Sequence, residues 1–213
     1  MATLILVPCK ALSAGKSRLG MLLTASERRA LCRRFLLDTL ELAAGLVAKD
    51  DIRVISPDES VMRIAADMGI RCLHDRGSDL NFAITAAVSA LAAREPDLAQ
   101  RDVLVLPIDL VTATPDALSP VLASPADLVL VPDRRERGTN VLRLPGAVAP
   151  LFQFQFGDDS FSRHLAEAER LRLRPRIVRD PALAFDLDTP TDYEEWFGSR
   201  SHDDSTVLQS RTA

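Results

Sequence analysis

The chain has 213 residues, of which 47% are hydrophobic and 26% are charged, and its formal net charge is −4. These values are ordinary for a soluble globular protein, and the length fits one α/β unit with a sizeable core. Without a broad basic field, nucleic acid and acidic membranes are poor partners, and no apolar run is long enough to span a bilayer. An anionic small ligand would therefore have to be held by a few placed cations, backbone amides and metal.

The start of the chain and its cysteines both favour a cytoplasmic protein. Residues 1–8 are apolar, but no basic segment precedes them and Lys10 follows too soon for a signal peptide, so we expect a buried strand here. Cys9, Cys32 and Cys72 are an odd number of cysteines without metal-type spacing. Reduced thiols in a cytosol are the simple interpretation.

Short β-type runs alternate with amphipathic helical runs in the first half of the chain. This alternation predicts an α/β fold with a mostly parallel sheet covered by helices. Thr24 and Glu27 have capping-box spacing and predict a long helix from about Ala25. The most apolar run, residues 103–106, is expected at the centre of the sheet. The other expected elements are strands at 4–7, 52–55 and 71–73 and helices at 60–68 and 81–94.

The second half of the chain shows a different pattern. Too few residues separate the expected strands 128–131 and 141–144 for a crossover helix, so the second is expected to be antiparallel. Phe152, Phe154 and Phe156 alternate with glutamines, which suggests a half-buried extended segment. The later expected elements are a helix at 161–171, a short strand from 177 and a helix at 191–197. The polar remainder predicts a domain at 1–197 and a disordered tail at 198–213.

The first candidate for chemistry is the cationic loop that follows the first strand. Such a loop lies at the carboxyl edge of an α/β sheet, where these folds bind ligands. Residues 15–17 look like the end of a Walker A loop, but Lys10 stands where its first glycine should be, so a P-loop is rejected. Lys10, Lys16 and Arg18 still gather positive charge where a triphosphate could lie. The alternative interpretation is a solvated loop.

Three carboxylates form the second candidate. Asp109 follows the central run 103–106 and could ligate Mg²⁺, which prefers oxygen ligands. Asp186 and Asp188 are two residues apart and point the same way if the backbone is extended, so they could share that metal. The alternative for Asp109 is a helix or turn cap, since Thr112 and Pro115 follow it. For the later pair the alternative is again capping, because Asp188 or Thr189 before Pro190 is a good helix start, and both interpretations can hold, one for each carboxylate.

Two further loops could contact an anion. Gly138 lets the backbone approach a ligand closely and Thr139 offers a hydroxyl, although a simple turn is the favoured interpretation of this segment. Residues 157–162 open a helix whose free amides favour an anion, although Asp158 and Asp159 could instead cap that helix. The three histidines show no spacing typical of a metal site or a catalytic triad; they are His74, His164 and His202.

Taken in order, these pieces resemble the guanylyltransferases of coenzyme F-420 biosynthesis from Leu4 to about Trp196. Members of that family are known by their acceptor as 2-phospho-L-lactate, phosphoenolpyruvate or 3-phospho-D-glycerate guanylyltransferases. The resemblance differs from the usual family pattern in the acidic pair at 158–159 and in the residues at 110–111. The matching pieces are 7–10, 16–19, 80–81, 107–109, 137–140, 156–161, 163–164 and 184–190.

The resemblance implies a single Rossmann-like nucleotidyltransferase domain with helices on both faces of the sheet. The implied Mg²⁺ ligands are Asp109, Asp186 and Asp188. The implied residues for the phosphorylated acid are Thr139, Gly157 and Ser160. The GTP side would comprise Lys10, Lys16 and Asn81, and catalysis would depend on Lys10, Lys16 and Arg18.

The implied reaction is attack of the acceptor phosphate on the α-phosphorus of GTP, with release of diphosphate. No general base is needed, because the acceptor phosphate is already an anion near neutral pH. Three alternatives remain open: a molybdopterin guanylyltransferase-like enzyme, a glycosyltransferase that uses a nucleotide sugar, and a nucleotide-binding protein without catalysis. We also expect a homodimer whose product passes to the next transferase of the pathway.

Overall fold

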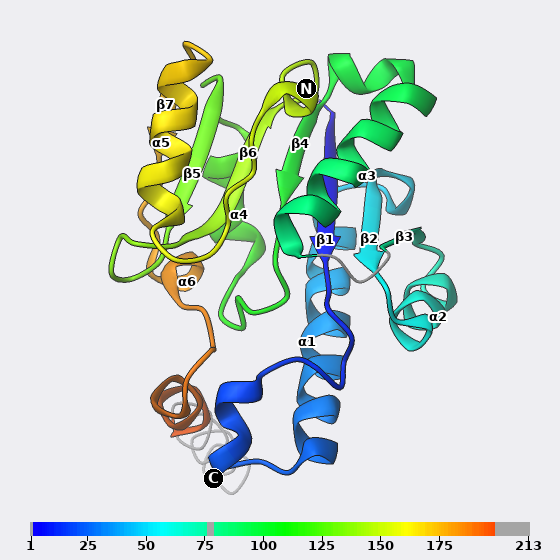
Figure 1. The fold of residues 1–213 in the computed structure, drawn as a ribbon, viewed down its shortest axis with the longest axis vertical. Helices are drawn as coiled ribbons and strands as arrows, with labels where there is room; N and C mark the ends of the chain where they lie inside the picture. The colour runs from blue at the N-terminus through cyan, green and yellow to red at the C-terminus, as the bar shows by residue number, and fades with distance from the viewer. Residues whose placement is uncertain (1, 76–78, 199–213) are drawn as a thin grey trace, which may run out of the picture.

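The computed structural model describes residues 2–75 and 79–198, which form a sheet flanked by helices (Figure 1). Seven strands in this part of the chain lie in the order β3-β2-β1-β4-β6-β5-β7. All neighbours are parallel except β6, which is antiparallel to β4 and to β5, as its short connection predicted. The strands are β1 (Thr3–Pro8), β2 (Ile52–Ser56), β3 (Arg71–His74), β4 (Asp102–Val105), β5 (Leu128–Pro132), β6 (Thr139–Pro145) and β7 (Pro175–Ile177).

Helices follow most of the strands, and the longest begins where its capping box predicted. The Glu27 amide donates to the Thr24 hydroxyl, and the Thr24 amide donates to the Glu27 carboxylate. The α-helices are α1 (Ala25–Leu46), α2 (Glu59–Asp67), α3 (Leu80–Arg94), α4 (Pro115–Leu122), α5 (Ser160–Arg170) and α6 (Pro181–Ala184), and residues 190–198 are also helical. The 3-10 helices are η1 (Ser17–Met21), η2 (Lys49–Asp51), η3 (Pro96–Gln100) and η4 (Ala149–Leu151).

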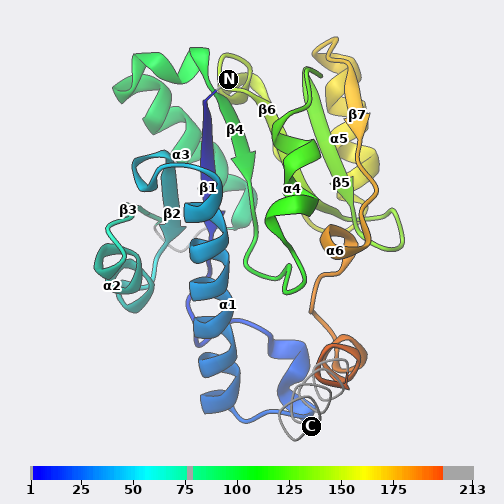
Figure 2. The ribbon, with the colours of Figure 1, turned by 180° about the vertical axis from the view of Figure 1, so that it is seen from behind.

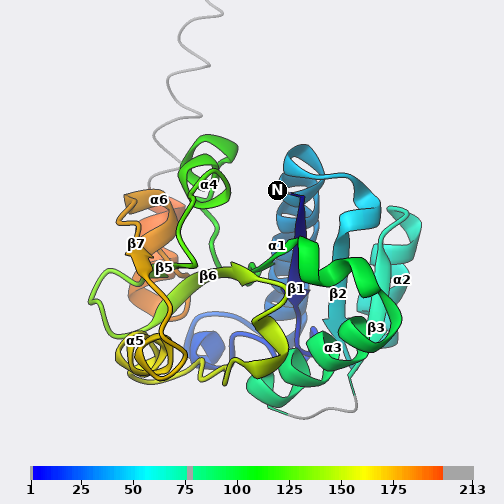
Figure 3. The ribbon, with the colours of Figure 1, turned by 90° about the horizontal axis from the view of Figure 1, so that it is seen from above.

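Helices cover both faces of the sheet. Helices α3 and α5 lie in front of it in Figure 1, and α1 and α4 lie in front in the reverse view of Figure 2. The view from above shows the sheet as the middle layer (Figure 3). Side chains of β1 alternate between two hydrophobic cores: Ile5 and Val7 pack toward α1, and Leu4 and Leu6 pack toward α3.

Several parts of the chain differ from the expected elements. Helix α6 (Pro181–Ala184) was not predicted, and β7 (Pro175–Ile177) ends at the residue where the short strand was expected to begin. Helix α4 was not predicted; Thr114 caps it, and Pro115 occupies its first turn. Residues 152–156 form no strand, and their backbone is held instead by side chains described below. The predicted tail lies outside the described residues except for Gly198, which is helical. None of the described helices combines the length and apolar character needed to cross a bilayer.

The topology brings two loops to one place. Strands β1 and β4 are parallel neighbours, so the loops that follow them leave the same edge of the sheet side by side. Strand β4 lies at the centre of the sheet, as its apolar run predicted, with β1 on one side and β6 on the other. The cationic loop and the first of the predicted carboxylates therefore meet at this edge.

Candidate active site

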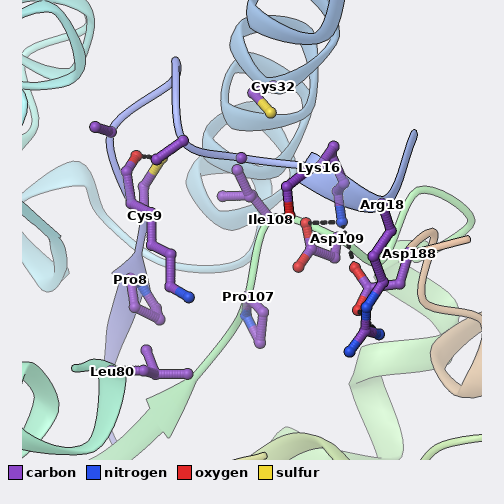
Figure 4. Close-up of a pocket in the computed structure, with 15 residues that line it drawn as sticks. Pro8, Cys9, Lys16, Arg18, Cys32, Leu80, Pro107, Ile108, Asp109 and Asp188 are labelled. Carbon is purple, nitrogen blue, oxygen red and sulfur yellow. Dashed lines mark hydrogen bonds and ion pairs between the residues drawn. The ribbon is translucent and has the colours of Figure 1, made fainter. Parts of the chain in front are cut away.

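A cavity of about 340 Å³ opens at the carboxyl edge of the sheet, beyond the ends of β1 and β4 (Figure 4). The loop after β1, residues 8–18, forms one wall, and residues 107–109 form another. Leu80 from α3, Cys32 from α1 and Asp188 complete the lining. The predicted cationic loop and two of the three predicted metal ligands therefore share one cavity.

Local contacts give the loop after β1 its shape. The Leu12 amide donates to the Asp58 carboxylate at 2.9 Å, which ties the loop to the start of α2. Gly15 passes so close to α1 that a Cβ atom on it would lie 2.5 Å from Cys32 Sγ. Lys16 has left-handed backbone angles, with φ of 54°. This backbone conformation is unusual for a residue other than glycine, asparagine or aspartate, so the loop is held firmly enough to maintain it.

The Lys16 ammonium joins two carboxylates that are far apart in the sequence. Its Nζ lies 2.5 Å from Asp109 Oδ1 and 2.8 Å from Asp188 Oδ1, and only 4% of its side chain is exposed. The Leu187 amide donates to the Asp109 carbonyl at 3.0 Å, and this bond brings the segment with Asp188 to the end of β4. Figure 4 shows the three side chains converging on one side of the cavity.

The charges in this group are strongly coupled. Burial raises the pKa of Asp109 and Asp188 adds to that effect, whereas the Lys16 ammonium opposes it. Burial alone would lower the pKa of Lys16, but Asp109 and Asp188 hold it above its ordinary value. The Cys9 thiol lies in the same cavity, where burial raises its pKa. It is therefore a neutral packing group rather than a nucleophile.

Asp186, the third predicted metal ligand, does not join the other two around the Lys16 ammonium. Burial raises the pKa of Asp186, and the nearby charges of Asp188 and Asp133 raise it further. Within residues 2–75 and 79–198, no three side chains of metal-ligating type gather closely enough to hold an ion. The structure thus assembles Asp109 and Asp188, and the role of Asp186 stays a prediction.

The capping interpretation of the segment before Pro190 is confirmed for Thr189, and the metal interpretation of Asp188 stays a prediction. Thr189 begins the helix: its hydroxyl accepts from the Asp192 amide, and its amide donates to the Asp192 carboxylate. Asp188 is left free to face Lys16.

The other predicted cations lie nearer to solvent. Lys10 lines the cavity, and Arg18 lies at its mouth with 70% of its side chain exposed. Arg18 Nη1 is 3.8 Å from Asp188 Oδ2, a distance typical of a weak surface ion pair. All three cations predicted from the first loop therefore border the same cavity.

A second, more apolar cavity of about 280 Å³ adjoins the first. The two share residues 8–11, Ala14 and Leu80. The rest of the second lining consists of Ile55, Pro57, Asp75 and Ala83. A charged compartment next to a more apolar one is suited to a ligand with a polyanionic part and a planar ring.

The three predicted acceptor residues lie together but line neither cavity among the described residues. The Thr139 amide donates to the Ser160 hydroxyl at 2.8 Å, and the Ser160 amide donates to the Gly157 carbonyl at 3.1 Å. Thr139 and Ser160 are both buried, at the first residues of β6 and α5. Because β6 runs antiparallel to β4, its first residue lies at the carboxyl edge where β4 ends.

The acidic pair that departs from the family pattern has a partner close by. Asp159 Oδ1 lies 2.9 Å from Arg137 Nε, and the arginine lowers the pKa of this carboxyl by hydrogen bonding and by its charge. Asp158 and Asp159 are both exposed. The negative charge of Asp159 is therefore balanced on the surface rather than placed next to the buried hydroxyls.

Asn81, predicted on the nucleotide side, clamps the chain just before Gly157. Its amide nitrogen donates to the Phe156 carbonyl at 3.0 Å, and its amide oxygen accepts from the Phe156 amide at 2.6 Å. This two-bond clamp ties the first turn of α3 to the segment that leads into α5. A direct nucleotide contact by Asn81 stays a prediction.

Two buried residues of α5, His164 and Glu167, hold the extended segment at 152–156, a role that was not predicted for either. The Gln153 amide donates to Glu167, and the Gln155 amide donates to His164 Nε2. They replace the strand partner that residues 152–156 lack, which explains the unpaired extended segment. The alternating phenylalanines signalled that segment, but the sequence contains no signal for the side chains that hold it.

The fold and the site together define the class of this protein. Residues 3–206 match the model of the family described as "Guanylyl transferase CofC like". A nucleotidyl transferase from Methanothermobacter thermautotrophicus has a similar fold, with a TM-score of 0.65 over 97% of this chain and 99% of that one, at 13% identity. This chain is a nucleotidyltransferase with a single Rossmann-like sheet.

Relatives with higher identity lead to the same family. A phosphoenolpyruvate guanylyltransferase of Sphaerobacter thermophilus is 35% identical, over 93% of this chain and 94% of the relative. A 3-phospho-D-glycerate guanylyltransferase of Phenylobacterium zucineum is 36% identical over 84% and 83%, respectively. A 2-phospho-L-lactate guanylyltransferase of Methanothermobacter thermautotrophicus is 32% identical over 92% and 84%. The chain belongs to the CofC-like guanylyltransferase family.

Proposed function

We propose that this enzyme transfers GMP from GTP to a small phosphorylated carboxylic acid and releases diphosphate, as a step of coenzyme F-420 biosynthesis. The observation that carries the proposal is the Lys16 ammonium between Asp109 and Asp188, at the carboxyl edge of the sheet, in a chain of this family. The acceptor would be phosphoenolpyruvate, 3-phospho-D-glycerate or 2-phospho-L-lactate, the acids for which its relatives are named. Its free cysteines suit a cytoplasmic setting.

Asp109 and Asp188 are suited to hold Mg²⁺. Each presents one oxygen to the same small cation, the Lys16 ammonium, at 2.5 and 2.8 Å. Magnesium is usually bound by one or two carboxylates together with substrate phosphates, so this pair fits it without a third ligand. When bound, the ion would add positive charge next to the phosphates.

The nucleotide would occupy both cavities, with its phosphates in the first and its base in the second. The triphosphate would lie along the first loop, where Lys10, Lys16 and Arg18 offset the repulsion between the nucleotide and an anionic acceptor. The base would enter the adjoining apolar cavity, against Pro8 and Ile55. The proposed preference for guanine follows from the family and not from any contact of these residues.

The acceptor would be held by Thr139, Gly157 and Ser160. The Thr139 and Ser160 hydroxyls and the backbone at the start of α5 lie at the edge where β4 ends and Asp109 follows. An acceptor phosphate oxygen would attack the α-phosphorus of GTP, and the bond from that phosphorus to the diphosphate oxygen would break. Positioning and charge neutralisation then account for catalysis, and no proton has to be removed.

Release of diphosphate tests the proposal directly. The wild-type enzyme with Mg²⁺ is assayed with GTP or ATP and with each of the three acids in parallel. We expect release with GTP and at least one of the acids. Equal turnover of ATP and GTP would contradict the guanine preference, and no release with any acid would contradict the acceptor class.

A further inference from the structure

His164 is a buried residue of α5, the helix that begins at the proposed acceptor residue Ser160. It lies on α5, its side chain has no exposed surface, and the rings of Phe152 and Phe156 lie 5.7 and 5.0 Å from it, centroid to centroid. It lines neither of the two cavities. A histidine in such a place either fills space or orients something else, and its hydrogen bonds decide between the two.

The hydrogen bonds of His164 fix which ring nitrogen carries the proton. The Gln155 backbone amide can only donate, and its nitrogen lies 3.0 Å from His164 Nε2, so Nε2 is the acceptor. Burial lowers the pKa of His164 to about 4, and the ring is therefore neutral at physiological pH. The single ring proton must then be on Nδ1, which lies 2.9 Å from Thr139 Oγ1.

This tautomer sets the direction of the next hydrogen bond. The Thr139 hydroxyl accepts from His164 Nδ1–H, so its own proton is left for another partner. The Ser160 hydroxyl likewise accepts, from the Thr139 amide. In the described part of the chain, no hydrogen bond has either hydroxyl as its donor. Both are therefore prepared to donate to a group that only accepts, such as a phosphate or carboxylate oxygen.

We propose that His164 is a positioning residue for acceptor binding: its Nδ1–H turns the Thr139 hydroxyl into an obligate donor toward the anionic acid. This inference rests on the proposed function, since it takes Thr139 as an acceptor contact. His164 also connects that hydroxyl to the extended segment through Gln155, and Asn81 clamps the same segment at Phe156. The direction of the hydrogen bond between His164 and Thr139 therefore depends on the position of the backbone that leads to Gly157.

A matched pair of substitutions separates positioning from packing. Asn and Leu have the same branched shape, but the amide of His164→Asn can replace Nδ1–H as a donor to Thr139, whereas His164→Leu cannot. Both variants lose the acceptor for Gln155. For the acid, we expect kcat/KM to fall about tenfold further in His164→Leu than in His164→Asn, while the KM for GTP stays unchanged in both. With Thr139→Val as background, the two should be equal.

Stability provides the opposing readout. Leu suits an apolar site between phenylalanine rings better than Asn does, so a purely structural role predicts that His164→Leu is the more stable and the more active variant. If the more stable variant is also the more active one, the inference is overturned. It is also overturned if the variants lose kcat/KM equally for GTP and for the acid.

The inference can also be tested without turnover or variants. In the wild-type protein at pH 7, ¹⁵N NMR of the His164 ring should show a protonated Nδ1 and an unprotonated Nε2. The opposite tautomer overturns the inference, even if both variants fail to fold. If the wild type transfers GMP to none of the three acids, the proposed function fails separately, whereas an observed Nδ1–H tautomer still supports the donor assignment.

Discussion

Lys16 Nζ lies 2.5 Å from Asp109 Oδ1, and this contact joins the two loops that leave the neighbouring strands β1 and β4. The same nitrogen also contacts Asp188. The lysine therefore holds together two carboxylates that would otherwise repel one another.

Replacing Lys16 with Met should remove this charge while keeping the length of the side chain. We expect kcat/KM to fall at least about 100-fold, because a placed cation next to the phosphates is lost. The free energy of unfolding should fall by only about 1–3 kcal/mol, because 35% of the Asp109 side chain remains exposed and is partly solvated. Diphosphate release and urea denaturation measure the two effects. The control is Lys49→Met, because Lys49 is exposed and lies before β2, at the edge of the sheet opposite the site. This substitution should change neither kcat/KM nor the free energy of unfolding.

Asp109→Asn and Asp188→Asn should each abolish turnover and weaken Mg²⁺ binding, because each removes a charged ligand while keeping the shape. Titration of Mg²⁺ by calorimetry measures the binding independently of activity. Asp67→Asn, on an exposed position of α2, should behave like the wild type. Unchanged Mg²⁺ affinity in both variants would refute the assignment of these two ligands.

Gly15→Ala should damage the first loop, and Cys32→Ala should repair it. The new methyl group would lie 2.5 Å from Cys32 Sγ, too close for any real contact, but 3.7 Å from Cys32 Cβ. We expect the single variant to lose about 1–3 kcal/mol of stability, as overpacked sites do, together with affinity for GTP. The double variant should regain most of both. Thermal melting and the KM for GTP check this, and a double variant no better than Gly15→Ala would show that the clash is not the cause.

Asn81→Leu distinguishes a clamp from a nucleotide contact. The clamp holds Phe156, next to the proposed acceptor loop, so its loss should raise the KM for the acid several-fold and leave the KM for GTP nearly unchanged. Steady-state kinetics with each substrate varied in turn measures both values. A selective rise in the KM for GTP would instead support the direct nucleotide contact that the resemblance implies.

Stability should fall in mild acid because of His164. Its pKa is about 4 in the folded protein, below the ordinary value of 6.5, so the unfolded chain binds the extra proton first as pH falls. The stability is complete above about pH 6.5 and decreases toward pH 4. Between pH 7 and pH 5 the wild type should lose about 2 kcal/mol more than His164→Leu, as measured by urea denaturation. Equal losses in the two proteins would show that the folded pKa is not depressed.

The sequence by itself determined most of the strands and longer helices along the chain and the type of sheet, although it missed α4 and α6. Hydrophobic period, the capping box at Thr24 and the short connection into β6 are local signals, and they act over a few residues. They also placed Lys10, Lys16 and Asp109 at strand ends, since parallel strands deliver such loops to one edge.

Only the tertiary structure decided which of these groups meet. Asp188 reaches Lys16 because the Leu187 amide bonds to the Asp109 carbonyl, a contact that no local pattern encodes. His164 likewise gains its role from Gln155 and Thr139, which come from separate segments. Hydrogen-bond partners distant in sequence are set by packing of the whole chain. For that reason the sequence indicated the residue types and the sheet edge, while the choice of partners and the direction of each proton came from the fold.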